Sequence, residues 1–419
     1  MRDILVSVII FGAIPFIMTR TYVGILMWSW ISYMNPHRMA YGFAYSFPFA
    51  QVIAIATLLS LLFNKEKKKF IVDPLTIFWV LFILWITITC FFALNPMAVW
   101  WEWERAVKIQ LFSIITVLVV TNKQRINALV MIIVFSLGFF GVKGGLFSLL
   151  TGGEYRVYGP PQSFIADNNA LALALVMILP FMRYLQLETR NTYIKIGLSM
   201  AMGLTALSIF TSYSRGALLA IISMVFVLWL RSKNKLKVTL VLIVLAPVLL
   251  NIMPDKWFSR MDTIETYKQD SSALGRINAW HFAFNLASDY PVTGGGFQIT
   301  TKELYLIYAP DPRVLHAAHS IYFEVLGEHG FVGLFIFLMV GIFALKSSSS
   351  IIKQTRDQPE LSWVNNLASM LQVSLVGYSI GGAFLNLAYY DLYWHIIALV
   401  VILKIYIRDF TSKDIQLSY

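Results

Sequence analysis

Residues 206–226 read ALSIFTSYSRGALLAIISMVF, and this stretch carries one charged side chain, that of Arg215. Similar stretches recur along the chain, and about a dozen are long enough, or nearly so, to span a bilayer as helices of about 20 residues. We expect spans at residues 3–18, 21–35, 47–63, 74–94, 106–121, 126–150, 169–184, 194–213, 216–230, 237–253, 326–345, 365–386 and 391–407. The first two are short, so residues 3–35 are interpreted as one span, two spans or a re-entrant pair, and the total is twelve or thirteen.

The composition agrees with a membrane protein. Hydrophobic residues make up 58% of the 419 residues and charged residues only 13%, whereas an ordinary soluble domain is about 45–50% apolar and about 25% charged. One soluble core of this length cannot hide that surplus, but lipid accepts apolar side chains on the outside of a helical bundle. The sequence therefore excludes a cytosolic enzyme, a secreted domain and a disordered chain, and predicts an all-α polytopic membrane protein.

The basic residues indicate the orientation, because cytoplasmic connections are rich in Lys and Arg. The connections around 20, 64–73, 122–127, 183–195, 231–237 and 346–360, with the tail from 404, hold 20 of the 33 basic residues and 7 of the 22 acidic ones. We expect these connections in the cytoplasm, and the net charge of +11 then reflects topology and not nucleic-acid binding. The predicted parts are the membrane helices of 1–253, one large helical loop on the outer face at 254–316, and the membrane helices of 317–419.

Two arginines at the outer face are candidates for binding an anion. Arg215 lies between small residues that form a turn, and snorkelling from a helix end is its simplest alternative interpretation. Arg276 is predicted in the first turn of a helix in DSSALGRINAWHF, where a cation opposes the helix dipole. Pairing with Asp270 or Asp289 is the alternative. Two guanidinium groups on one face would suit a pyrophosphate, because each grips phosphate oxygens in a fixed fork.

The helix predicted to begin near His316 supplies a candidate base. Its spacing from His319 would place both imidazoles on one helix face, but no carboxylate at matching spacing completes a metal site, so no metal is predicted. A neutral imidazole can activate a hydroxyl, and His319 is the first candidate, with His316 second. Lys143, with glycines on both sides, and Asp167, which could equally cap a helix, are candidates for substrate binding.

These motifs resemble the O-antigen ligase and polymerase superfamily. The resemblance rests on Tyr213-Ser214-Arg215-Gly216, on Arg276 ahead of Pro291–Phe297, and on Ala318-His319-Ser320 running to Glu328-His329-Gly330. Many members carry Asn at the position of Ser320. The segments MNPHRMAYGFA at 34–44, GVKGGLF at 141–147 and YRVYGPPQSFIADNNALALAL at 155–175 look like the subgroup described as a probable O-glycosylation ligase associated with exosortase A.

The resemblance implies a glycosyltransferase of the bacterial inner membrane with its active site facing the periplasm. The donor would be a glycan on undecaprenyl diphosphate, and the acceptor a hydroxyl of lipid A–core or of a protein Ser or Thr. Arg215 and Arg276 would hold the diphosphate, and His319 would act as general base in an inverting reaction that needs no metal or other cofactor. A polymerase on the same machinery is the first alternative. A polysaccharide transporter is the second, although no inverted repeat is visible.

Overall fold

The computed structural model describes residues 1–66, 68–232, 234–262 and 271–417, and every regular element within these ranges is a helix. The elements of the first part are α1 (Arg2–Thr19), α2 (Thr21–Met34), η1 (Pro36–Met39), α3 (Phe43–Ser46), α4 (Phe49–Phe63), α5 (Pro74–Cys90), α6 (Val99–Val119), α7 (Lys123–Leu150) and α8 (Asn168–Glu188). They are followed by α9 (Thr192–Phe210), α10 (Arg215–Arg231), α11 (Lys235–Ile252), α12 (Asp255–Asp262), α13 (Ser271–Asp289), α14 (Lys302–Tyr308), α15 (Ile321–Thr355), η3 (Pro359–Leu361), α16 (Ser362–Gly381), η4 (Gly382–Phe384) and α17 (Asp391–Leu417). The predicted all-α fold class is confirmed.

Six helical segments of the described chain are long and apolar enough to cross a membrane. They are Arg2–Thr19, Lys123–Leu150, Asn168–Glu188, Thr192–Phe210, Ile321–Thr355 and Pro359–Phe384. Each of the other predicted spans also falls on a helix, but α2, α4, α5 and α10 have only 14, 15, 17 and 17 residues. The total of twelve or thirteen spans therefore stays a prediction.

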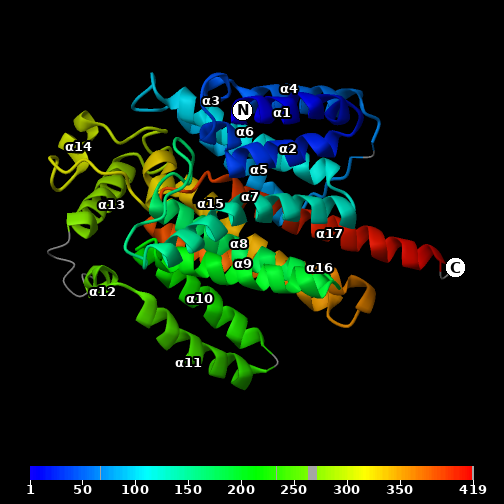
Figure 1. The fold of residues 1–419 in the computed structure, drawn as a ribbon. Coiled ribbons are helices and arrows are strands. Elements are labelled where there is room, and N and C mark those ends of the chain that lie inside the picture. Colours follow the sequence, from blue (N-terminus) through cyan, green and yellow to red (C-terminus); the bar gives the residue numbers. More distant parts are fainter. Residues whose placement is uncertain (67, 233, 263–270, 418–419) are drawn as a thin grey trace.

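The long helices run roughly side by side, with α8 near the middle (Figure 1). In α8, 78% of an 18-residue apolar stretch is buried, and α9 and α16 pack against this helix. The outer helices α1 and α9 bury only 17% and 22% of theirs. An apolar helix that leaves most of its surface uncovered suits a lipid environment, where the surrounding chains are as apolar as the side chains.

The amino-terminal helices settle one question that the sequence left open. Arg20 has an extended backbone with φ −142° and separates α1 from α2, which pack against each other. A single span over residues 3–35 is therefore wrong: because the helical hydrogen bonding is interrupted at Arg20, the chain forms two helices.

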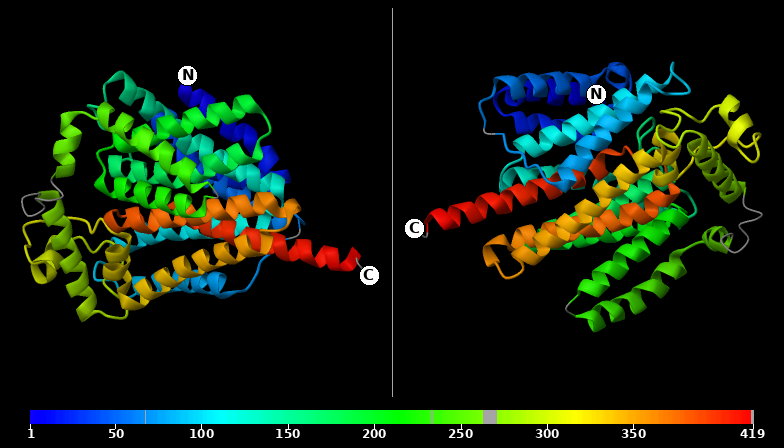
Figure 2. Two further views of the ribbon diagram at one scale, coloured as in Figure 1. Left: turned by 90° about the horizontal axis from the view of Figure 1, so that it is seen from below. Right: turned by 180° about the vertical axis from the view of Figure 1, so that it is seen from behind.

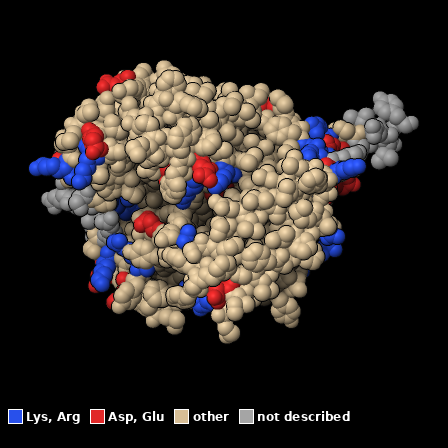
Figure 3. Space-filling model, turned by 90° about the horizontal axis from the view of Figure 1, so that it is seen from above, with Lys and Arg blue, Asp and Glu red and all other residues tan. Residues whose placement is uncertain are grey.

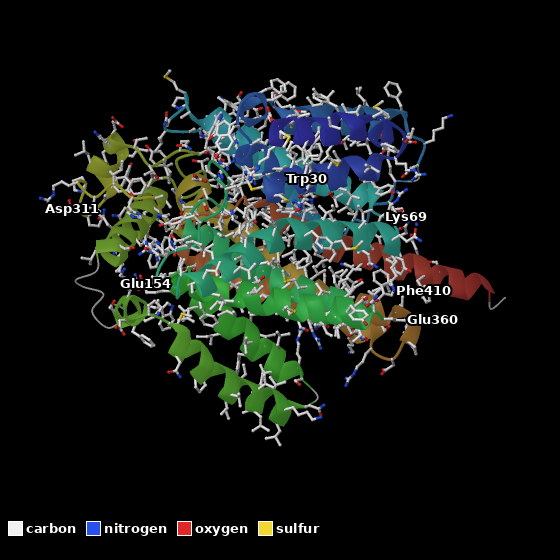
Figure 4. The ribbon with its side chains drawn as sticks, in the orientation of Figure 1. Trp30, Lys69, Glu154, Asp311, Glu360 and Phe410 are labelled. Carbon is white, nitrogen blue, oxygen red and sulfur yellow. The ribbon has the colours of Figure 1, made fainter. Side chains whose placement is uncertain are left out.

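The basic connections gather at one end of the bundle. Figure 4 places Lys69, Glu360 and Phe410 at that end, and Glu154 and Asp311 at the opposite end. Contacts between the connections agree, because Arg125 binds Glu66 at 2.7 Å and Lys69 pairs with Asp409. Figure 3 shows the molecule from above. On this face the charged side chains lie mainly in the left half and at the right end, with a broad uncharged area between them.

Helices α13 and α14 lie at the end opposite to the carboxyl-terminal part of α17, as both views of Figure 2 show. A glycine turn ties them to α15: Gly295 N donates to Gly327 O at 2.9 Å, and Gly296 N donates to Glu328 O at 2.8 Å. At the same place α15 is broken by Gly330, whose φ is +68° and ψ −173°. Only glycine adopts this conformation readily, so the break fixes where the loop docks.

Candidate active site

The turn before α10 holds Arg215 at the end of the bundle that carries α13. Tyr213 has a left-handed backbone, with φ +59°, and its hydroxyl donates to Gly153 O at 2.8 Å. Ser214 caps the helix, because its Oγ accepts from Ala217 N at 3.2 Å. Arg215 is consequently the first residue of α10, and it is half-buried. The turn that the sequence predicts before Arg215 agrees with this geometry.

Arg276 lies on α13, also half-buried, in the second turn and not in the first turn as expected. The described part of the helix begins at Ser271, and the helix dipole opposes a cation beyond the first turn less than predicted. Residue 270, proposed as a cap and ion-pair partner, lies outside the described residues. Asn278 anchors α13 by donating to Asp311 O at 2.9 Å and to Val314 O at 3.1 Å.

Arg215 and Arg276 line one small pocket, although they come from helices far apart in the sequence. The other lining residues are Asn169, Tyr213, Ser214, Gly216, Phe384 and Leu385. Phe384 covers Gly216 closely, because a Cβ on that glycine would lie 3.1 Å from Phe384 Cβ. Phe384 and Leu385 gave no signal in the sequence, since they belong to an apolar run. Asn169 could have been noticed as a polar neighbour of Asp167.

The two histidines do not lie on a helix, and the prediction that a helix begins near His316 is wrong. The segment from Ala309 to Ser320 is not helical, and α15 begins only at Ile321. Distant side chains bind this backbone: Tyr305 Oη donates to His316 O, and Trp280 Nε1 donates to Ala318 O at 2.7 Å. These carbonyl oxygens accept hydrogen bonds from other helices, which is compatible with a non-helical backbone. The three-residue spacing of His316 and His319 therefore does not place them on one helix face.

The imidazoles nevertheless come together beside Arg276. The ring centroids of His316 and His319 are 4.7 Å apart, and a Cβ on Gly275 would lie 3.1 Å from His316 Cδ2. Burial, then His316 and then Arg276 lower the pKa of His319 to about 4, against a smaller opposing effect of Asp167. His319 is thus neutral at physiological pH, which is the protonation state of a general base.

The two remaining candidates have different surroundings. Asp167 caps α8 by accepting from Asn169 N at 2.8 Å, as its alternative interpretation stated, and it is also within electrostatic reach of His319. Lys143 lies apart from this group, exposed in an apolar groove of about 660 Å³ between α7, α8 and α9. Its flanking glycine Gly145 serves helix packing, because a Cβ there would lie 2.2 Å from Leu204 O.

Among the described residues, no three His, Cys, Asp or Glu side chains are grouped so that they could hold a metal ion. A cationic pocket with a neutral base next to it is suited to an anionic leaving group and a hydroxyl nucleophile.

Residues 199–338 match the O-antigen ligase family model. The matched range contains Arg215, Arg276 and His319. Residues 1–190, which contain Lys143 and Asp167, match a family of unknown function, DUF5935. No curated protein gives a significant match to the chain.

The match supports a membrane function of the O-antigen ligase or polymerase kind, and hence a glycosyl-transferring enzyme. The six span-like helices agree with a multi-pass membrane protein. The narrower resemblance to the exosortase-associated subgroup stays a prediction.

Proposed function

We propose that the protein transfers a glycan from undecaprenyl diphosphate to an acceptor hydroxyl, of lipid A–core or of a protein Ser or Thr, on the periplasmic face of the bacterial inner membrane. The observation that carries the proposal is the shared pocket of Arg215 and Arg276, with the His319 imidazole near Arg276.

Arg215 and Arg276 would bind the diphosphate of the donor. Glycan transfer breaks the bond between the anomeric carbon and the diphosphate oxygen, and negative charge grows on that oxygen as it leaves. Fixed guanidinium groups aimed at this charge stabilise the transition state more than the ground state. Arginine suits the task because it stays charged and binds phosphate oxygens through two parallel hydrogen bonds.

His319 would take the proton from the acceptor hydroxyl as its oxygen attacks the anomeric carbon from the face opposite the diphosphate. The configuration at that carbon inverts. With a pKa of about 4, the imidazole is almost wholly unprotonated from pH 6 to 8 and is ready to accept. Bound diphosphate places anionic charge near the imidazole, which raises its proton affinity in the complex. Neither step requires a metal ion.

Lys143 and Asp167 would take part in substrate binding, together with His316. The apolar groove beside Lys143 suits the polyprenyl chain of the donor, because its lining is almost wholly apolar. Asp167 and His316 lie nearer the base, where a sugar hydroxyl of donor or acceptor could bind.

The test follows release of undecaprenyl diphosphate by the purified protein in nanodiscs, supplied with lipid-linked glycan and a panel of acceptors. We expect acceptor-dependent release that survives EDTA, falls by about 10²–10⁴-fold in His319→Ala, and falls by about 10²–10³-fold in Arg215→Lys and Arg276→Lys. His281→Ala and Arg313→Lys are matched controls, since both residues are exposed.

The acceptor that supports release separates a ligase from a polymerase: a lipid A–core or protein hydroxyl indicates a ligase, and a second lipid-linked glycan indicates a polymerase. If the glycan stays on its lipid with every acceptor while intact donor moves between leaflets, the protein is a transporter and the proposal is wrong.

A further inference from the structure

A second cavity of about 410 Å³ lies at the same end of the bundle as the arginine pocket, built mainly by the amino-terminal half of the chain. Its walls come from the end of α2, the start of α4, the first turns of α6, the loop before α8 and the start of α17. The polar and aromatic lining includes Ser32, Asn35, His37, Gln51, Trp101, Glu104, Arg105, Lys108, Gln162, Phe164 and Asp391. Its volume is that of an ordinary ligand site, roughly 300–1,000 Å³.

Two buried polar atoms in this lining lack a hydrogen-bond partner within the described chain. Asp391 is 2% exposed, and its Oδ2 accepts from Ser32 while its Oδ1 has no partner. Nδ1 of His37 is also buried without a hydrogen-bond partner. Buried polar atoms are nearly always satisfied, so an orphaned carboxylate oxygen on a cavity wall indicates a ligand that donates to it.

The lining combines hydrogen-bonding groups with aromatic surface. Trp101 lines the cavity and is 65% exposed, and the Arg105 guanidinium lies 3.6 Å from the ring centroid of Phe164. Sugars present hydroxyl groups around their edge and an apolar C–H face, so they use an indole face together with carboxylate and guanidinium groups.

The charges of the lining make the diphosphate and the polyprenyl chain of the donor poor ligands for this cavity. The carboxylates of Glu104 and Asp391 balance the cations of Arg105 and Lys108 in the described lining, whereas the first pocket brings two arginines together. A diphosphate would be drawn to the arginine pocket. A polyprenyl chain would leave the polar lining without partners, which costs free energy.

The two cavities have neighbouring walls. The loop before α8 gives Phe164 to the second cavity, and the first turn of α8 gives Asn169 to the arginine pocket. Leu385 lines the arginine pocket, and Asp391, the first residue of α17, lines the second cavity. The loops meet, since the rings of Phe164 and Tyr390 are 6.1 Å apart. A glycan whose reacting end lies between the arginines and His319 could therefore extend into the second cavity.

We infer that this second cavity is a saccharide-binding subsite, which holds a sugar residue of the donor glycan or of the acceptor next to the proposed transfer site. The inference rests on the proposed function for the identity of its substrates. It gives the amino-terminal half of the chain a role in selecting the glycan.

The first experiment measures binding without turnover. Free glycan released from the lipid-linked donor by mild acid, and separately the core oligosaccharide of the acceptor, are titrated against the full-length protein in nanodiscs by thermal shift. A ligand that binds only the folded state raises the melting temperature in a saturable way. We expect such a shift with one of the two saccharides, and a loss of at least about tenfold in affinity for Asp391→Asn and Trp101→Ala. Trp100→Ala, which alters a neighbouring exposed indole outside the lining, should bind as the parent does.

The second experiment uses the release assay. Asp391→Asn and Trp101→Ala should raise KM for the saccharide-bearing substrate about tenfold and leave kcat within about twofold, because they remove binding and not the reacting groups. If a donor carrying a single sugar abolishes the difference between variant and parent, the subsite holds the donor glycan; if the difference follows the acceptor concentration, it holds the acceptor.

Absence of a saturable shift with both saccharides, or full retention of binding and KM in both variants, overturns the inference. The proposed function fails separately: a parent protein that binds saccharide but never releases undecaprenyl diphosphate keeps the subsite and loses the transferase.

Discussion

Replacing Gly330 with alanine should destabilise the protein, because this glycine has a backbone conformation and close backbone neighbours that leave no room for a Cβ. The residue has φ +68° and ψ −173°, a region that costs a residue with a Cβ about 1–3 kcal/mol. Its Cβ would also lie 2.6 Å from Val292 O and 2.7 Å from Pro291 O. These are backbone atoms and cannot rotate away, so the glycine turn must move.

The movement puts three hydrogen bonds at risk: Gly295 to Gly327 and Gly296 to Glu328, as described above, and Phe331 N to Pro291 O at 2.9 Å. Each such bond contributes about 1 kcal/mol net, and not all are lost together. With the backbone strain, we expect Gly330→Ala to lower the free energy of unfolding by about 2–4 kcal/mol.

The assay is unfolding of the detergent-solubilised protein by increasing SDS mole fraction, followed by tryptophan fluorescence. Gly197→Ala in α9 is the control, since a Cβ there meets nothing within 4 Å; it should be neutral or stabilise by up to about 1 kcal/mol. Because the turn anchors α13, glycan transfer by the folded fraction of Gly330→Ala should also fall, by on the order of 10²-fold for a displacement of about 1 Å at Arg276. An unfolding free energy within about 0.5 kcal/mol of the parent, the range of a surface substitution, would refute this reasoning.

Three further predictions concern the candidate site. In NMR titrations of histidine-labelled protein, His319 should titrate near pH 4, and its pKa should rise in Arg276→Gln while staying below 6.5, because burial remains; a midpoint at 6.5 in the parent contradicts the described environment. His319→Gly should be more stable than His319→Ala by about 1 kcal/mol, because both lose the imidazole but only alanine keeps a Cβ at the positive φ of +42°; equal stability in SDS unfolding would mean that the backbone is not left-handed there. Lys143→Met should raise KM for the lipid-linked donor about tenfold with kcat unchanged, and a lowered kcat at constant KM would place Lys143 in the chemistry instead.

Local properties of the sequence were sufficient for the parts of the fold that depend on local physics. Each apolar run forms a helix because lipid-facing backbone must satisfy its own hydrogen bonds. Asp167 caps a helix because a short polar side chain reaches the free backbone N–H groups. For the predicted span 106–121, the predicted start of the helix is too late. The helix begins at Val99, and its aromatic and charged first turns conceal it from a hydropathy criterion.

Features that depend on tertiary contacts could not be predicted. Helix α15 begins at Ile321 and not near His316 as predicted, because Trp280 and Tyr305, from other helices, bind the preceding carbonyl groups. Asp391 stands at the start of an apolar run, so the sequence alone suggests a helix end; its orphaned oxygen on a cavity wall becomes visible only when α2 and α6 are placed around it.

The start of α15 at Ile321, beyond the two histidines, matters for the proposed chemistry. A non-glycine residue at φ +42° is held against its own preference, so the contacts of its neighbours must fix it. Trp280, which binds Ala318 O, lies on α13 one turn beyond Arg276, and the same helix is fixed by Asn278 to the segment that leads to the histidines. His319, the proposed base, and Arg276 are therefore positioned by a single helix, while Arg215 is positioned independently by the capped turn of α10. If α15 began at His316, His319 would instead continue the axis of α15 and would have no such tie to α13. Electrostatic catalysis requires a preorganised relation between a base and a phosphate-binding cation. For the proposed roles of His319 and Arg276, this relation would arise from the non-helical segment before α15.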